Sequence, residues 1–166
     1  MRHAHRYDEL ARLVSERGDG LLAAAVLLTG DRPSAEDLFQ HALERVMRRG
    51  TRLRGDPEGY LRRTMYHLAV DRWRGLVRRR EVYGRAADAE VADHADGVEL
   101  RSELMRALRQ LPPRQRAVLV LRYFEQLSEA EAARVLGCSV GTVKSSSARA
   151  LRRLRDQIDD LAALRQ

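Results

Sequence analysis

The chain has 166 residues and a mass of 18.9 kDa, with 44% hydrophobic residues, a formal charge of +7 and a pI near 10.4. That length allows one ordinary domain or two small ones, and the basic surplus favours a polyanionic partner. A single cysteine, Cys138, excludes an internal disulfide and a cysteine-based zinc site. The longest apolar run, residues 21–28, falls short of the ~20 residues that span a bilayer and lies too deep for a secretory signal. We therefore expect a soluble, cytoplasmic protein with no membrane insertion.

Charge is unevenly distributed along the chain. Residues 1–85 carry 18 basic and 12 acidic side chains, residues 86–100 carry five acidic and no basic ones, and residues 101–166 carry 13 basic and seven acidic ones. The apolar periodicity fades around the acidic stretch, as is typical of a flexible connection. Two basic blocks separated by an acidic one indicate two small domains and a linker.

Helix signals predominate over strand signals. β-branched residues are sparse, and no Asn-Gly or Asp-Gly hairpin turn occurs. We therefore predict an all-α protein of two small helical domains, residues 1–80 and 99–166, joined by an acidic flexible linker over residues 81–98. A surface loop inside one helical domain is the alternative.

Two helices are predicted after the apolar run. Ser34 begins a capping-box pattern that opens a helix over residues 35–49, and Gly50 ends it. Pro57 suits the first turn of a long helix that reaches about Arg80.

The C-terminal block contains the most specific pattern, a predicted helix-turn-helix. Two prolines, at 112 and 113, separate two helices, the second of which runs to about Phe124. Ser128 begins a second capping-box pattern, Gly137 ends the short helix that follows, and Ser139 caps a last, longer helix. Two helices joined by so tight a turn are typical of helix-turn-helix DNA-binding proteins.

The last predicted helix has two different faces at about 100° per residue. An apolar stripe is formed by Val143, Ala150, Leu151 and Leu154. The opposite face carries hydroxyl and guanidinium groups with no acid, from Thr142, Ser145, Ser146, Arg149, Arg152 and Arg153. Such groups bind phosphates and base edges in the major groove. A merely solvated polar face is the alternative.

The long helix after Pro57 is also two-faced. Its predicted inward residues are Leu61, Met65, Leu68, Ala69 and Leu76. The other face interleaves aromatic and basic side chains, with Arg63, Tyr66, Val70, Trp73, Arg74 and Val77. Rings on which bases stack, beside arginines that bind phosphates, are typical of single-strand binding. A lone tryptophan in a helix is more often part of a core, and its combination with arginines makes the two interpretations about equal.

The helix over residues 35–49 begins with acidic residues, among them Asp37. Acidic residues in a first turn stabilise the N-terminus of the helix, which is the purely local interpretation. Gln40 and His41 lie farther along the helix and are not needed for capping, so they favour a protein-docking surface. We find no spaced carboxylate pair, no nucleophile triad, no phosphate loop and no metal-ligand spacing. We expect no enzymatic activity, no metal and no cofactor.

Seven motifs follow one another along the chain. The first four are Leu27–Arg32, Ala35–Gln40, Tyr60–Thr64 and Leu68–Arg74. The last three are Leu111–Val118, Ser128–Ala133 and Gly141–Ser145. In this order they resemble regions two and four of bacterial RNA polymerase sigma factors of the sigma-70 family, and most of all the minimal two-domain extracytoplasmic-function (ECF) group.

The resemblance implies a role for each block. In the first domain, core polymerase is bound by Asp37, Leu38, Gln40, His41 and Leu43. The −10 element is recognised and opened by Tyr60, Arg62, Arg63, Tyr66, His67, Asp71, Trp73 and Arg74. In the second domain, the −35 major groove is contacted by Ser139, Thr142, Lys144, Ser145, Ser146, Arg149, Arg152 and Arg153. The acidic linker threads the polymerase cleft. The implied partners are core RNA polymerase, promoter DNA and an anti-sigma factor, with no small-molecule substrate.

The predicted function is therefore that of a dissociable promoter-specificity subunit. The alternative is a stand-alone helix-turn-helix regulator that binds duplex DNA without polymerase. A helical adaptor that binds only protein would leave the acid-free face of the last helix unexplained.

Overall fold

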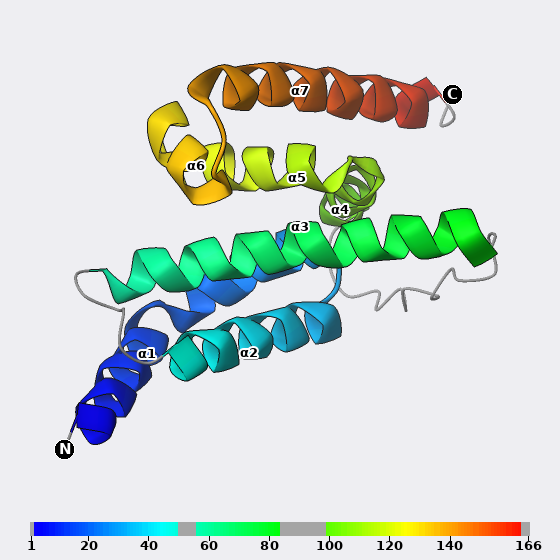
Figure 1. Cartoon of the computed structure of the whole chain (residues 1–166). Coiled ribbons are helices and arrows are strands. Elements are labelled where there is room, and N and C mark those ends of the chain that lie inside the picture. Colours follow the sequence, from blue (N-terminus) through cyan, green and yellow to red (C-terminus); the bar gives the residue numbers. More distant parts are fainter. Residues whose placement is uncertain (1, 50–55, 84–98, 164–166) are drawn as a thin grey trace.

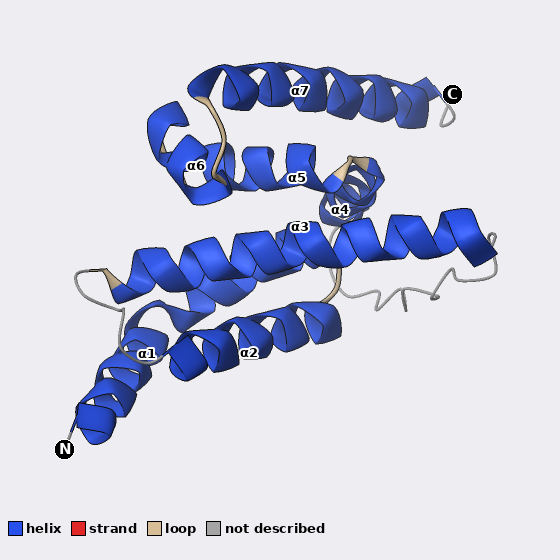
Figure 2. Cartoon of the chain, viewed as in Figure 1, coloured by secondary structure: helices blue, strands red, loops and turns tan. Residues whose placement is uncertain are grey.

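The computed structural model describes residues 2–49, 56–83 and 99–163, and every regular element in this part of the chain is helical (Figures 1 and 2). The N-terminal unit consists of α1 (Arg2–Thr29), α2 (Arg32–Arg49) and α3 (Pro57–Tyr83). The C-terminal unit consists of α4 (Glu99–Gln110), α5 (Pro113–Leu119), η2 (Val120–Phe124), α6 (Glu129–Leu136) and α7 (Val140–Ala163). The all-α prediction is confirmed.

The ends of α2 and α3 are set by acidic side chains. The Asp31 carboxylate accepts the Ser34 backbone N–H at 2.8 Å, so α2 begins at Arg32 and the predicted capping box at Ser34 is wrong. Asp56 accepts the Gly59 N–H at 2.8 Å and opens α3 in the same way. The predicted stop at Gly50 lies outside the described residues.

The long helix α3 extends past its predicted end. It runs to Tyr83, so residues 81–83, predicted as the start of the linker, are helical. The rest of the predicted linker, residues 84–98, lies outside the described part of the chain.

The helix-turn-helix forms as predicted. Ser128 Oγ accepts the Glu131 N–H at 3.2 Å, and the Glu131 carboxylate accepts the Ser128 N–H at 2.7 Å, which completes the capping box. Gly137 ends α6 with φ 64°, a left-handed conformation that costs glycine little. Ser139 Oγ then accepts the Thr142 N–H at 3.1 Å and caps α7.

A π-helical turn follows α5. The Glu125 N–H donates to the Val120 carbonyl at 2.9 Å, and the Leu127 N–H donates to Leu121 at 3.0 Å. Gln126 has φ 55° and reverses the chain toward α6. This turn, which the helical pattern did not reveal, carries the Glu125 side chain toward α3.

The two units share one hydrophobic core. A single buried cluster joins residues of α1, α2 and α3 to residues of α5, η2, α6 and α7. Its fully buried members include Leu38, Leu61, Val118, Leu121 and Val143. In Figure 1, α3 lies between the other N-terminal helices and the C-terminal unit, and α5 lies between α3 and α7. The units therefore pack as neighbours around α3.

Two arginines of the C-terminal unit also donate hydrogen bonds to backbone carbonyls at the C-terminal end of α1, which has no basic residue in its last turn. Arg116 Nη1 donates to the Leu28 carbonyl at 2.6 Å, and Arg109 donates to the Gly30 carbonyl at 2.6 and 3.1 Å. These carbonyls lie at or just beyond a helix C-terminus, where intrahelical donors run out and positive charge is favourable. Gly30 has φ 96°, and a Cβ there would lie 2.6 Å from Arg109 Nε, so glycine permits this close approach.

No helix in the described ranges combines the length and the apolar character needed to cross a membrane.

Candidate nucleic-acid interface

The helix α7 presents the predicted arginine face to solvent. Val143 and Ala150 are fully buried on the inner side, where α7 packs on α5 and α6. Arg149, Arg152 and Arg153 are exposed, and no ion pair is found for them among the described residues. Three uncompensated guanidinium groups on one helix create the positive field that attracts a polyanion.

The edge of the apolar stripe differs from the prediction. Leu151, predicted to point inward, is 37% exposed, because it lies farther round the helix than Val143 and Ala150. Leu154 is half-buried and packs on a small cluster with Leu108, Leu111 and Ala150. The inward stripe is therefore narrower than the sequence suggested.

The first turns of α7 position the predicted hydroxyl groups. Ser139 Oγ lies 2.9 Å from Thr142 Oγ1, and Ser145 Oγ donates to the Thr142 carbonyl at 3.2 Å. Lys144 pairs with Glu129 of α6 at 3.6 Å, so one predicted DNA-binding cation is partly neutralised within the helix-turn-helix. Ser146 is half-buried.

The C-terminal unit covers part of the candidate −10 surface on α3. Tyr66, predicted to lie on an open face, is fully buried, and that expectation is wrong. Its hydroxyl donates to Glu125 Oε1 at 2.7 Å, and the Glu125 carboxylate also forms an ion pair with Arg62. His67 Nε2 lies 2.9 Å from the Val135 carbonyl of α6. Three of the eight predicted residues thus contact the C-terminal unit.

Burial and charge change the proton affinities of this pair. Burial raises the pKa of Tyr66 well above its ordinary value, and the Glu125 carboxylate raises it further. Burial alone lowers the pKa of Arg62, but the carboxylates of Glu125 and Glu58 outweigh it and the net pKa is raised. Both groups keep their protons at neutral pH, so Glu125 faces one cation and one neutral hydroxyl.

The remaining candidates on α3 differ in exposure. Arg63 and Asp71 are exposed, and Tyr60 is half-buried. The side chains of Trp73 and Arg74 lie outside the described set, although their backbone belongs to α3.

The candidate docking residues of α2 divide into two groups. Asp37, Gln40 and His41 are exposed, whereas Leu38 is fully buried in the shared core and Leu43 packs against it. The prediction that Leu38 contacts a partner is therefore wrong: it is one of the residues that hold α2 in place.

A residue that the sequence did not single out links α2 to α3. Arg72 Nη1 lies 2.8 Å from Asp37 Oδ2, and His41 Nδ1 lies 3.4 Å from the same oxygen. Arg72 also contacts His41 directly. These partners come together only when α2 and α3 pack, and no local pattern signals them. The candidate docking surface is thus joined to the candidate −10 helix by an ion pair.

The described residues contain no group of three or more His, Cys, Asp or Glu side chains arranged to hold a metal ion.

Comparisons with known proteins agree with this arrangement. A family model described as Sigma-70 region 2 matches residues 13–81, and one described as Sigma-70, region 4 matches residues 101–154. The "RNA polymerase sigma-E factor" of Streptomyces antibioticus is 39% identical over 153 residues, covering 91% of this chain and 85% of the relative. The "ECF RNA polymerase sigma factor SigE" of Mycolicibacterium smegmatis is 36% identical over 160 residues, covering 92% of this chain and 61% of the relative.

A solved structure has a similar fold. It is the sigma factor RpoE of Bartonella quintana, crystallised with the anti-sigma factor NepR. The TM-score is 0.72 at 23% identity, covering 91% of this chain and 97% of that chain.

Proposed function

The chain belongs to the sigma-70 family of RNA polymerase sigma factors, and we propose that it directs core polymerase to promoters through its two helical units. The main support is the face that α7 presents over residues 142–153, which carries no acid and exposes Arg149, Arg152 and Arg153 beside the helix-turn-helix. Such a face fits the major groove of duplex DNA.

The division of labour follows the two units. The C-terminal unit, predicted as residues 99–166, binds the −35 element with the hydroxyl and guanidinium groups of α7. The N-terminal unit, predicted as residues 1–80, contacts the −10 element with α3. Arg63 is exposed there, whereas Arg62 and Tyr66 contact Glu125 in this structure. Unpaired bases that stack on aromatic rings, with their phosphates bound by arginines, shift the equilibrium between closed and open DNA toward the open form.

Core polymerase binds the exposed polar side of α2. Asp37, Gln40 and His41 are accessible there, and Leu38 anchors the helix from below. The Asp37–Arg72 ion pair joins this side of α2 to α3, so the docking surface lies next to the −10 helix.

Regulation by an anti-sigma factor is part of this proposal. The structurally similar Bartonella quintana protein was crystallised with such a partner, and its fold covers nearly all of this chain. The factor acts in the cytoplasm with the chromosome and contributes no chemistry of its own, since nucleotide addition belongs to the polymerase.

Run-off transcription with purified core enzyme on genomic fragments tests the function. Core enzyme with the wild-type chain yields discrete transcripts that core enzyme alone does not. Arg149→Ala reduces transcription from the selected promoter, whereas the matched variant Arg155→Ala, off the acid-free face of the same helix, leaves it nearly unchanged. Absence of any chain-dependent transcript, together with specific duplex binding by the chain alone, favours the stand-alone regulator instead.

A further inference from the structure

The helix-turn-helix contains an acidic residue that its own capping box does not use. The first turn of α6 carries Glu129 and Glu131. Glu131 completes the capping box with Ser128, whose backbone N–H it accepts at 2.7 Å. The Oε2 atom of Glu129 instead lies 3.6 Å from Nζ of Lys144 on α7. One acid therefore serves the helix end, and the other pairs with a cation of the candidate DNA-binding helix.

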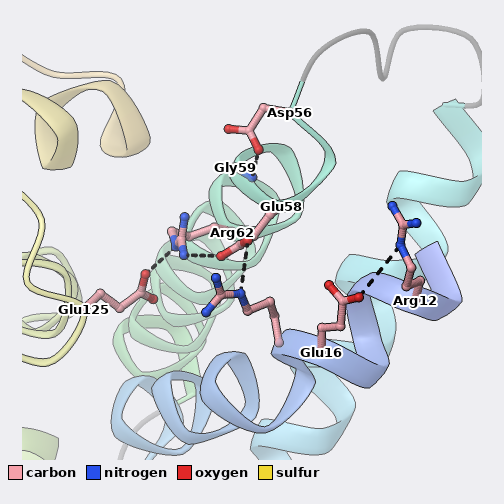
Figure 3. A network of polar contacts seen from close by, with 8 residues as sticks. Arg12, Glu16, Asp56, Glu58, Gly59, Arg62 and Glu125 are labelled. Carbon is pink, nitrogen blue, oxygen red and sulfur yellow. Dashed lines mark hydrogen bonds and ion pairs between the residues drawn. The ribbon is translucent and has the colours of Figure 1, made fainter. Parts of the chain in front are cut away.

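The Glu129–Lys144 pair differs from the ion pairs that join helices elsewhere in the chain. Figure 3 shows Arg62 between the carboxylates of Glu58 and Glu125, where the three side chains are 21%, 31% and 8% exposed. Lys144 is 64% exposed and Glu129 is 37% exposed. An ion pair so accessible to water contributes little to folding, because water and salt screen it. Its main effect is therefore on the charge that this surface presents to a ligand.

The N-terminus of α6 lies where a DNA backbone is expected. When the second helix of a helix-turn-helix enters the major groove, the first helix crosses the sugar-phosphate backbone. A helix N-terminus ordinarily attracts phosphate, because its free N–H groups and its dipole are positive there. Here the Ser128 cap and the two carboxylates of the first turn occupy that end. This corner of the helix-turn-helix is thus unfavourable for a phosphate.

The ammonium group of Lys144 retains donors for a different kind of contact. It carries three N–H donors, and Glu129 lies on one side of it. Guanine presents two neutral acceptors, O6 and N7, in the major groove, and lysine binds them. A phosphate carries a full negative charge, which a neighbouring carboxylate repels. Pairing with Glu129 therefore weakens a phosphate contact of Lys144 more than a contact with a guanine edge.

We propose that Glu129 is a positioning residue that makes Lys144 selective: it withholds the lysine charge from the phosphates of arbitrary duplex DNA and leaves the ammonium group for a guanine edge in the correct site. The inference rests on the proposed function, because it takes α7 as the helix that enters the major groove. The specificity comes from a penalty on the wrong complex, and not from a stronger contact in the right one.

The salt dependence of non-specific binding tests whether the lysine charge is withheld. The full-length chain, without polymerase, is titrated onto a labelled duplex of mixed sequence at several salt concentrations, and fluorescence anisotropy gives the slope of log affinity against log salt. Each phosphate contact contributes about 0.9 to the size of that slope. Arg149→Met lowers it by about 0.9, whereas Lys144→Met changes it little. Glu129→Gln raises it by about 0.9 and strengthens binding about threefold, an effect typical of an exposed ion pair.

Further variants separate the release of Lys144 from other causes. In the Glu129→Gln background, Lys144→Met lowers the slope by about 0.9, because the freed lysine contacts a phosphate. Glu9→Gln removes the same charge from an exposed position on α1 and leaves the slope unchanged. A Glu129→Gln slope equal to that of the wild type overturns the proposal, as does a rise that persists without Lys144. Should Glu129→Gln impair folding, which circular dichroism reports, a Lys144→Met loss equal to that of Arg149→Met overturns it without any change in α6.

The second readout is selectivity in the complex with core polymerase. A labelled duplex that carries a promoter selected by run-off transcription is competed with unlabelled duplex of mixed sequence. The competitor concentration that halves the promoter complex falls about threefold in Glu129→Gln and stays constant in Glu9→Gln. Unchanged selectivity in Glu129→Gln means that this acid only stabilises its helix end, and it overturns the proposal. Chain-dependent transcription by the wild type reports on the proposed function itself, so failure of that function is recognised separately.

Discussion

Arg116 offers the sharpest test of how the two units are held together. Its side chain is 4% exposed, and its guanidinium donates to the carbonyls of Leu28, Arg109 and Leu111 at 2.6, 2.7 and 3.3 Å. Burial, with help from the neighbouring Arg109 charge, lowers its pKa to about 10. The residue is therefore a buried cation that backbone carbonyls alone compensate.

The cost of Arg116→Met follows from these contacts. Each hydrogen bond to a charged group contributes roughly 1.5–3 kcal/mol to the free energy of unfolding. The two short bonds alone, at the low value, give about 3 kcal/mol, and all three, at the high value, give about 9 kcal/mol. The burial penalty expressed in the lowered pKa offsets about 3 kcal/mol of either figure, which leaves a range of about 0–6 kcal/mol. We expect a loss near the middle of that range, about 3 kcal/mol, a large part of the stability of a typical domain.

Urea unfolding followed by far-UV circular dichroism measures this loss. The control is Arg106→Met, which makes the same substitution at an exposed position of α4. A midpoint for Arg116→Met equal to that of the control refutes the reasoning, because it means that the carbonyls of Leu28 and Arg109 find equivalent donors elsewhere.

Three further predictions concern separate parts of the chain. Burial first, and Glu125 second, raise the pKa of Tyr66, so the contribution of its protonated hydroxyl to folding stability is complete below about pH 10 and declines at higher pH. In a titration followed by tyrosinate absorbance, the wild-type chain has a transition at high pH that Tyr66→Phe lacks. A Tyr66→Phe titration curve equal to that of the wild type counts against the buried hydroxyl. Ser128→Ala removes the α6 cap and costs about 1 kcal/mol in thermal or urea unfolding, whereas the exposed Ser15→Ala serves as the control. Asp37→Ala breaks the contact with Arg72 and weakens binding to core polymerase in a pull-down, while binding of free duplex DNA by the chain stays constant and the exposed Asp19→Ala binds normally; equal loss of both activities argues against a separate docking surface.

Helix ends were predictable wherever one local side chain determines them. Ser128 with Glu131, the left-handed Gly137 and the cap at Ser139 all act within four residues of the backbone they satisfy. The start of α2 differs from the prediction because Asp31, and not Ser34, accepts the backbone N–H that caps the helix. Pro33, in the first turn of the observed helix, is the signal that favours Asp31.

The covered face of α3 was not predictable from periodicity. Helical spacing shows which residues share a face, but it does not show what packs on that face. Tyr66 meets Glu125 across 59 positions of sequence, and Arg72 meets His41 across 31. Neither pair leaves a local trace, because each depends on how whole helices pack. Leu38 is a related case, because a helix that binds a partner with one side also buries its other side in the core, and Leu38 lies on the buried side of α2.

Polymerase-dependent promoter recognition is tested most directly by titrating a labelled promoter duplex with the chain alone and with the chain plus core polymerase, read by mobility shift. We expect a sequence-specific complex only when polymerase is present, with at most weak, salt-sensitive binding by the chain alone. Equally tight and specific binding without polymerase contradicts it.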